Sequence, residues 1–233
     1  MTWRDPGPAH RTPLAPPFPE GATDGHPLPS RPPDHLEHRP ARPRLPQLLI
    51  GLWLYGTSLG VMVRAGLGVN PWDVLNQGMV HHFGLSIGTW VSIIGALVLL
   101  LWIPLRQVPG IGTVGNVLIL GVAMDVTVGL LDTPGNWPAR IALLAGGILL
   151  NGLATGLYIG ARFGPGPRDG LMTGLQRRTG RSVRLIRTCI ELTVLAIGVL
   201  LGGTVGVGTV AYALAIGPLA QFFLRWCAVP ETR

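Results

Sequence analysis

The sequence contains the same pattern twice, and the second copy follows the first at a constant offset of 96 positions, so that Pro71 recurs as Pro167. The residues that recur without a gap are Gly51, Gly56, Gly60, Gly68, Asp73, Gly78, Gly84, Ser86, Gly110, Gly112, Thr113 and Gly121. Each copy holds three apolar segments, and an odd number of membrane crossings turns the second copy upside down relative to the first. The duplication therefore predicts two inverted three-helix repeats, an arrangement that many transporters share.

Composition assigns the chain to the membrane. Of its 233 residues, 48% are hydrophobic and only 12% are charged, which is typical of a polytopic membrane protein. Six apolar segments each approach the ~20 residues needed to cross the hydrocarbon layer. They cover residues 47–63, 87–105, 112–131, 141–161, 183–203 and 207–226. We therefore expect an all-α membrane protein of six transmembrane helices, with the lipid bilayer as a partner.

The fifth segment is the weakest of the six because Arg184, Arg187 and Glu191 fall in its first half. A charge near the bilayer centre costs ~2.5–3.5 kcal/mol on insertion scales. The arginines can extend to the near interface, and Arg187 lies one helical turn from Glu191, so a local ion pair can offset much of this cost. A topology of five spans remains the alternative.

The chain divides into a tail and two membrane repeats. Residues 1–46 hold thirteen of the twenty-two prolines and almost no apolar run, so they are predicted to form a disordered cytoplasmic tail. The repeats cover residues 47–132 and 139–228. If the N-terminus is inside, only Arg64 and Arg140 fall on the outer side, and the other arginines of the tail and loops fall inside. This asymmetry predicts that both termini are cytoplasmic.

A short helix is predicted between the first two spans of each repeat. Asn70 and Gly166 are suitable N-caps, and Pro71 and Pro167 occupy first helical positions, where no donor is needed. Asp73 and Asp169 follow in the first turn and offset the positive end of the helix dipole. Glycines at positions 84 and 180 predict the ends of these helices.

Two placements of the short helices stay open. They lie at the membrane interface, or they dip into the protein from opposite faces and present their N-termini to one shared cavity, as discontinuous helices of transporters do. The glycines at small-x-x-x-small spacing have a structural explanation. Gly56 and Gly60 in the first span, and Gly152, Gly156 and Gly160 in the fourth, are expected to let these two spans pack against each other.

Polar residues within apolar segments are candidates for a solute or proton path. Asp125 in the third span has no visible partner in its own segment, and Asn116 precedes it there. Glu191 has two explanations, a functional carboxyl group or a structural partner of Arg187. With the residues of the short helices, the candidate path comprises Asn70, Asp73, Asn116, Asp125, Asp169, Arg187 and Glu191.

Several classes of function are not expected. The sequence has no zinc-protease, Walker or serine-hydrolase motif, so neither an enzyme nor a cofactor site is predicted. Cys189 and Cys227 lack metal-ligand spacing, and the histidine pairs form no metal site. The net charge of +7 comes largely from arginines between apolar segments, which membrane orientation explains better than nucleic-acid binding.

Several motifs resemble a known family. The stretch Gly-Val-Asn-Pro-Trp-Asp-Val-Leu from Gly68, the stretch Gly-Leu-Ser-Ile-Gly-Thr-Trp from Gly84, and Gly-Ile-Gly-Thr-Val-Gly-Asn from Gly110 are similar to the YczE/YyaS/YitT group of bacterial integral membrane proteins. The second copy departs from this pattern, with Arg168 where the first has Trp72. The resemblance implies a multi-pass protein of the bacterial cell membrane and no established activity.

Two hypotheses of function follow. The inverted duplication, the paired helix starts and Asp125 favour a small secondary transporter or exporter of an anionic or zwitterionic solute. The long arginine-bearing tail and the diverged second loop favour instead a membrane regulator or scaffold for a partner protein. Whether the chain forms a homodimer or binds another protein stays open.

Overall fold

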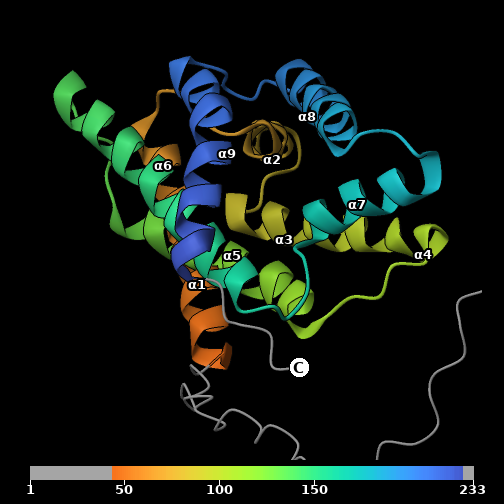
Figure 1. Cartoon of the computed structure of the whole chain (residues 1–233). Coiled ribbons are helices and arrows are strands. Elements are labelled where there is room, and N and C mark those ends of the chain that lie inside the picture. The colour runs from red at the N-terminus through yellow and green to blue at the C-terminus, as the bar shows by residue number, and fades with distance from the viewer. Residues whose placement is uncertain (1–43, 228–233) are drawn as a thin grey trace, which may run out of the picture. The chain divides into compact units, whose positions relative to one another are not determined.

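The computed structural model describes residues 44–227, and this part of the chain is helical throughout, without strands (Figure 1). The helices are α1 (Arg44–Ala65), α2 (Pro71–Phe83), α3 (Ile87–Leu100), α4 (Trp102–Leu105), α5 (Ile111–Leu130), α6 (Trp137–Gly160), α7 (Pro167–Thr179), α8 (Val183–Leu200) and α9 (Val207–Cys227). The tail predicted for residues 1–46 lies outside the described residues, except for its last three, which already belong to α1.

Five stretches within the described residues are long and apolar enough to cross a membrane. They are α1, the combined α3 and α4, α5, α6 and α9. The fifth expected span, residues 183–203, corresponds to α8, which has 18 residues and carries Arg184, Arg187 and Glu191. These three charges set α8 apart, because each of the other five has an 18-residue window with at most two charged residues.

The two short helices form where the sequence predicts them. α2 begins at Pro71 after the N-cap Asn70, and α7 begins at Pro167 after the N-cap Gly166. Both end at the expected glycines, Gly84 and Gly180, each of which has a positive φ (66° and 68°) that favours glycine. Local capping chemistry therefore sets the bounds of these two helices.

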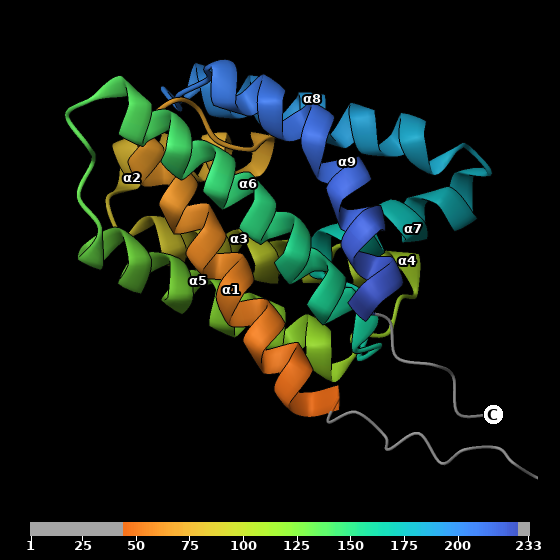
Figure 2. The same ribbon diagram turned by 60° about the vertical axis from the view of Figure 1, so that its left-hand side comes forward.

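The expected pairing of the first and fourth spans is confirmed, but Gly56 and Gly60 on α1, and Gly152 and Gly156 on α6, face other helices. α1 lies between α5 and α6 (Figure 2). Gly51 of α1 approaches the backbone of Tyr158 on α6, where an added Cβ would stand 2.8 Å from the amide nitrogen. Gly56 instead faces α5 and Gly152 faces α9. Sequence spacing identified close packing but not the helix that each glycine faces, which depends on how α1 and α6 are rotated about their axes.

Some contacts between the two repeats occur twice, the second time with the roles of the two repeats exchanged. The amide of Gly112 donates to the carbonyl of Phe163 at 2.9 Å, and the amide of Gly208 donates to the carbonyl of Leu67 at 2.8 Å. Gly208 is the repeat position of Gly112, and Phe163 is that of Leu67, so one contact is the other with the two copies exchanged. The close approach of α6 to Gly51 recurs in the same way at Gly147, which faces Met62 of α1.

One pair of contacts lacks its counterpart. α3 packs against α5 so closely that a Cβ at Gly88 would overlap the carbonyl oxygen of Gly121. The repeat position of Gly121 is Gly217 on α9, where an added Cβ would have nothing within 4 Å. The repeat position of Gly88 is Arg184 on α8, and its side chain is exposed. α8 therefore does not pack on α9 as α3 packs on α5.

Buried apolar side chains form two clusters. The larger joins α1, α5, α6 and α9 around Leu52, Leu59 and Met124. The smaller joins α2, α3, α7 and α8 around Trp72, Ile94 and Val194. A polar cavity lies where the two clusters meet.

Candidate functional site

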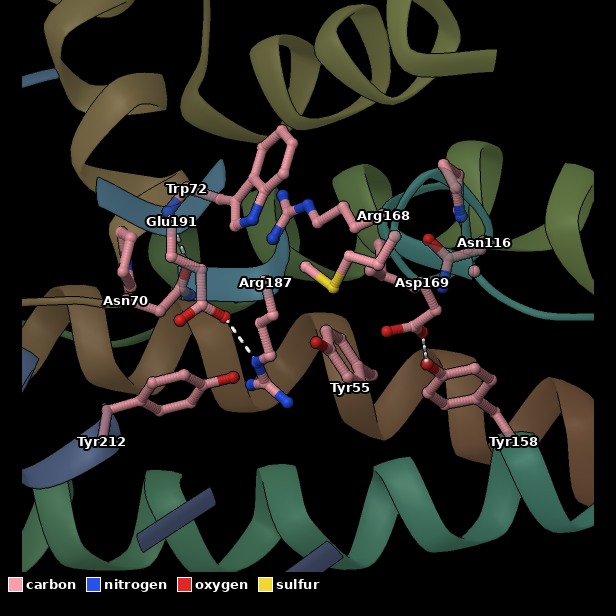
Figure 3. A pocket seen from close by; sticks show the side chains of 15 residues that line it. Tyr55, Asn70, Trp72, Asn116, Tyr158, Arg168, Asp169, Arg187, Glu191 and Tyr212 are labelled. Atoms are coloured by element: carbon pink, nitrogen blue, oxygen red, sulfur yellow. Dashed lines mark hydrogen bonds and ion pairs between the residues drawn. The ribbon is translucent and has the colours of Figure 1, made fainter. Parts of the chain in front are cut away.

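The N-termini of α2 and α7 meet at one cavity of about 70 Å³ (Figure 3). Both helix starts contribute to its wall, as do side chains from α1, α5, α6, α8 and α9. The lining residues named in Figure 3 are Tyr55, Asn70, Trp72, Asn116, Tyr158, Arg168, Asp169, Arg187, Glu191 and Tyr212. The volume holds roughly five waters at the ~10–15 Å³ that each requires. A solute of this size has only a few non-hydrogen atoms.

At the start of α2, side chains satisfy the first helical turn. The Asn70 side-chain oxygen accepts hydrogen bonds from the amides of Trp72 and Asp73, both at 3.1 Å. The Asn70 amide group donates to the Asp73 carboxylate, and the amide group of Asn76 donates to its other oxygen at 2.9 Å. Asp73 is fully buried, and this burial raises its pKa. At the α2 end of the cavity, the first amides and the Asp73 carboxylate are therefore satisfied within the protein, while the side-chain oxygen of Asn76 is buried without a partner among the described residues.

At the start of α7, the equivalent cap is missing. Gly166 occupies the position of Asn70, and no side chain caps the first turn of α7. The first amides of a helix have no partner within the helix, so this end keeps donors for a ligand. The Asp169 carboxylate is fixed by the hydroxyl of Tyr158, which donates to it at 2.6 Å. The two helix starts are thus similar in backbone and different in hydrogen-bonding capacity.

Two arginines bring positive charge to the cavity. The guanidinium of Arg168 lies over the indole ring of Trp72, 4.7 Å from its centroid. Arg187 of α8 donates through Nε to the Glu191 carboxylate at 2.8 Å, and the two side chains are 45% and 26% exposed. Figure 3 shows the remaining guanidinium nitrogens of Arg187 between Tyr55 and Tyr212. The structural partnership expected for Glu191 is present, and the pair lies on the cavity wall.

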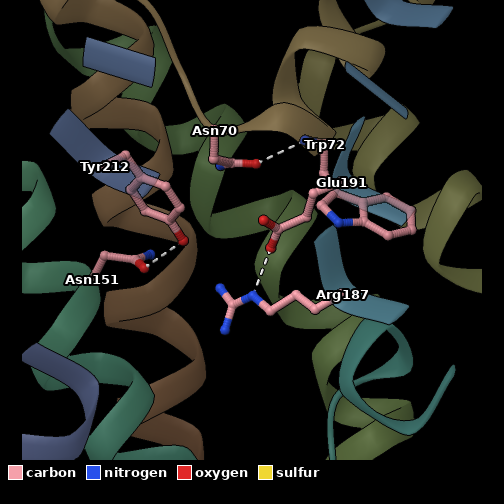
Figure 4. A network of polar contacts seen from close by, with 6 residues as sticks. All are labelled: Asn70, Trp72, Asn151, Arg187, Glu191 and Tyr212. Atoms are coloured by element: carbon pink, nitrogen blue, oxygen red, sulfur yellow. Dashed lines mark hydrogen bonds and ion pairs between the residues drawn. The ribbon is translucent and has the colours of Figure 1, made fainter. Parts of the chain in front are cut away.

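Tyr212 connects the cavity to a buried network (Figure 4). Its hydroxyl donates to the Asn151 side-chain oxygen at 3.1 Å, and the Asn151 amide group donates to Ser58 at 2.7 Å. Asn151 and Ser58 are fully buried. Because buried polar groups are costly without partners, this chain of bonds fixes the tyrosine hydroxyl at the cavity edge.

The structure brings together most of the candidate path. Asn70, Asn116, Asp169, Arg187 and Glu191 line the cavity. Asp73 does not line it but lies directly behind Asn70, to which it is hydrogen bonded.

Asp125 lies elsewhere. Its carboxylate accepts hydrogen bonds from the hydroxyl of Ser86 and, at 2.8 Å, from the amide of Gly88, which joins α5 to the start of α3. It borders a second, mainly apolar cavity of about 540 Å³ near Arg64 and His81. The expectation that Asp125 shares a cavity with the two helix starts was therefore wrong, because the partner that it lacks in its own helix is supplied by α3.

The tyrosines and Trp72 line the cavity but were not predicted to do so from the sequence. The repeat offset contains a usable signal, because Tyr212 is the repeat position of Asn116 and Tyr55 is that of Asn151. A polar or hydroxyl side chain thus stands at both positions in both copies. No group of three or more His, Cys, Asp or Glu residues within residues 44–227 could hold a metal ion.

The length of the helices and the apolar surface of the protein define its class. Large apolar side chains such as Leu118, Leu149 and Leu214 are exposed along helices of transmembrane length, while polar side chains gather at an internal cavity. Such a surface is compatible with lipid and not with water. The protein is a helical, multi-span membrane protein.

The chain belongs to the family of unknown function DUF6198, whose sequence profile matches residues 43–225. An uncharacterized protein of Haemophilus influenzae is 40% identical over 178 residues, which cover 76% of this chain and 82% of the relative. The uncharacterized membrane protein YczE of Bacillus subtilis is 35% identical over 171 residues, 73% of this chain and 79% of the relative. The uncharacterized protein YyaS of the same organism is 24% identical, with 75% and 89% covered. These relatives confirm the resemblance drawn from the motifs. No solved structure matches the chain.

Proposed function

We propose that the protein is a small secondary transporter of anionic or zwitterionic solutes, and that the cavity between α2 and α7 is its solute site. The observation that carries the proposal is that two helix starts, one from each copy of the duplication, line the same cavity. Discontinuous helices that direct their N-termini at a central site are a recurring device of transporters with inverted repeats. The 70 Å³ volume restricts the solute to a few heavy atoms.

The proposal includes six spans arranged as two inverted repeats. The exchanged contacts, Gly112 with Phe163 and Gly208 with Leu67, support a twofold relation between the copies. If α8 is the fifth span, each copy crosses the membrane three times and the two copies have opposite orientation. α2 and α7 then enter from opposite faces, and their N-termini meet within the membrane, where irregular backbone is tolerated because it lines a cavity.

The charges of the cavity favour a solute with a negative group. Arg168 is held by Trp72 rather than by a carboxylate among the described residues, and the uncapped start of α7 adds backbone donors beside it. Asp169 and Glu191 are each already bonded, to Tyr158 and Arg187. For the positive group of a zwitterion, the aromatic side chains of Tyr55 and Tyr212 line the same cavity.

A ligand screen on the purified full-length protein tests the solute site. Small carboxylates, amino acids and inorganic oxyanions are added singly in detergent, and the melting temperature is measured. A ligand at 100 times its Kd stabilises the fold by ~2.7 kcal/mol, which is roughly 5–11 °C at ~2–4 °C per kcal/mol. A ligand found in this way is then tested for flux into proteoliposomes, which must saturate and depend on the protein.

The control compares two arginines on the same helix. Arg168→Gln removes a charge at the cavity, and Arg178→Gln removes one from the exposed end of α7, where Arg178 donates to the carbonyl of Pro104. Losing a hydrogen bond to a charged group costs ~1.5–3 kcal/mol, so Arg168→Gln should weaken binding at least tenfold and Arg178→Gln should not. If no small anion or zwitterion stabilises the protein, or if both variants bind equally, the solute site is wrong and a membrane scaffold becomes the better hypothesis.

A further inference from the structure

The two copies differ most clearly on one face of α3 and α8. α3 turns Gly88, Val91 and Gly95 toward α5, and all three are buried. The same repeat positions on α8 are Arg184, Arg187 and Glu191. Spacing of three and four residues places these charges on one side of the helix. In the first copy these positions of α3 pack tightly against α5, and in the second copy the same positions of α8 carry charged side chains.

The apolar side of this helix is the same in both copies. Trp90, Ile94 and Val98 of α3 are buried, and Ile186 and Val194 of α8, at the positions of Trp90 and Val98, are also buried. Both helices therefore keep an apolar side toward the smaller cluster. The substitution is confined to the side that, in the first copy, packs against the neighbouring span.

The equivalent surface of α9 still consists of small residues that would allow close packing, but no helix among the described residues packs against it. Ala213 and Gly217 occupy the repeat positions of Val117 and Gly121, which face Gly95 and Gly88 in the first copy. On α9, Ala213 is exposed, and an added Cβ at Gly217 would meet nothing within 4 Å. At these positions α8 and α9 are thus not packed on each other, whereas the equivalent surfaces of α3 and α5 are in close contact.

We propose that the crevice between α8 and α9 is filled with water and is the path by which a small anion reaches the cavity from the cytoplasmic side. This inference rests on the proposed six-span transporter. Charged side chains at membrane depth face a wet cavity or a partner rather than lipid. Arg187 and Glu191 on the stripe, and Tyr212 on α9, already line the solute cavity. Arg184 stands one turn closer to the start of α8, on the side where the loop arginines gather, and attracts anions to the mouth.

The equivalent route on the other side is closed in this structure. The backbones of α3 and α5 meet at Gly88 and Gly121, and the Asp125 carboxylate binds the hydroxyl of Ser86 and the amide of Gly88 across the same contact. The repeat position of Asp125 is Gln221, which is exposed on α9. The structure therefore holds α3 and α5 in close contact and leaves α8 without the equivalent packing on α9.

Cysteine labelling at matched positions tests the crevice. In full-length protein with Cys189→Ser and Cys227→Ser, single substitutions Ala213→Cys and Val117→Cys place thiols at the same position of the two repeats. Leu214→Cys adds a lipid-facing control, because Leu214 is 73% exposed on the outer surface of α9. Only the thiolate reacts, and thiolates form poorly without water. Inside-out vesicles are treated with a membrane-impermeant sulfonated maleimide, and parallel samples with a lipophilic maleimide.

The expected result is that Ala213→Cys reacts with the sulfonated reagent many times faster than Val117→Cys and Leu214→Cys, and from the cytoplasmic side only. Equal rates at positions 213 and 117 would show that the two copies do not differ in water access, and reaction at 213 with the lipophilic reagent alone would show that lipid fills the space between α8 and α9. Either result would overturn the proposal. The labelling needs neither a solute nor flux. If position 213 is labelled but the protein binds no solute, the proposed transport is refuted and the crevice is not. If position 213 is not labelled but the protein binds a solute in a way that depends on Arg168, the crevice is refuted and the solute site is not.

Discussion

A glycine on α5 and its repeat position on α9 should respond differently to the same substitution. In Gly121→Ala the added methyl group would overlap the carbonyl oxygen of Gly88 and the hydroxyl of Ser92. The Ser92 side chain can rotate away, but the Gly88 carbonyl belongs to the backbone of α3 and cannot. α3 must therefore move outward from α5. In Gly217→Ala the methyl group enters open space.

The magnitudes follow from the two environments. Overpacking a tight contact costs ~1–3 kcal/mol, and at ~2–4 °C per kcal/mol the melting temperature of Gly121→Ala should fall by roughly 2–12 °C. In Gly217→Ala no overlap arises, and alanine is favoured over glycine inside a helix by ~0.5–1 kcal/mol. The melting temperature of Gly217→Ala should therefore not fall and should rise by roughly 1–4 °C.

The assay is thermal unfolding of the detergent-purified variants, followed by intrinsic tryptophan fluorescence at one heating rate. Size-exclusion chromatography at 20 °C, chosen as roughly the temperature of maximum stability, checks that each variant starts folded. If Gly217→Ala loses as much stability as Gly121→Ala, α8 packs on α9 as α3 packs on α5. The asymmetry between the two copies would then be wrong.

Three further predictions concern topology, the Asp125 contact and the α2 cap. Thiols introduced at the exposed positions Gly135, in a loop, and Thr179, at the end of α7, should be reachable from outside only at 135, with 179 labelled after permeabilisation, and equal access would contradict the inverted repeats. Asp125→Asn keeps an acceptor for the amide of Gly88 and should preserve the melting temperature, whereas Asp125→Leu leaves that amide without its partner and should cost ~1–3 kcal/mol; equal melting of the two would argue against the contact. Asn70→Ala removes a cap and should cost ~0.5–2 kcal/mol in the same unfolding assay, and an unchanged melting temperature would show that the cap contributes nothing.

Local chemistry made the short helices predictable. An N-cap followed by proline and aspartate, and a glycine 13 residues after the proline, fix the start and end of α2 without reference to any tertiary contact. The same holds for α7. The hypothesis that both N-termini reach one cavity also followed from sequence, because the duplication implies that what one short helix does, the other does from the opposite side.

Tertiary detail was not predictable in the same way. Gly51, Gly56 and Gly60 all lie on α1, but one faces α6 and two face α5. Helix rotation decides this, and the spacing of small residues does not encode it. The partner of Asp125 is Ser86, 39 residues away in the chain, and no pattern within the third span could reveal it.

The divergence of Trp72 and Arg168 illustrates how a duplicated chain can gain from losing its symmetry. Residues close to a twofold axis contact the residues at their own repeat positions. Positions 72 and 168 are one such pair, and their side chains are in contact. Two arginines there would repel each other, and two tryptophans would leave the cavity without a cation at this point. One of each gives an attractive pair of ~0.5–2 kcal/mol, which holds the guanidinium at the cavity wall. The departure of the second loop from the first is therefore a reason to expect different roles for α2 and α7, in which α2 supplies the support and α7 the positive charge.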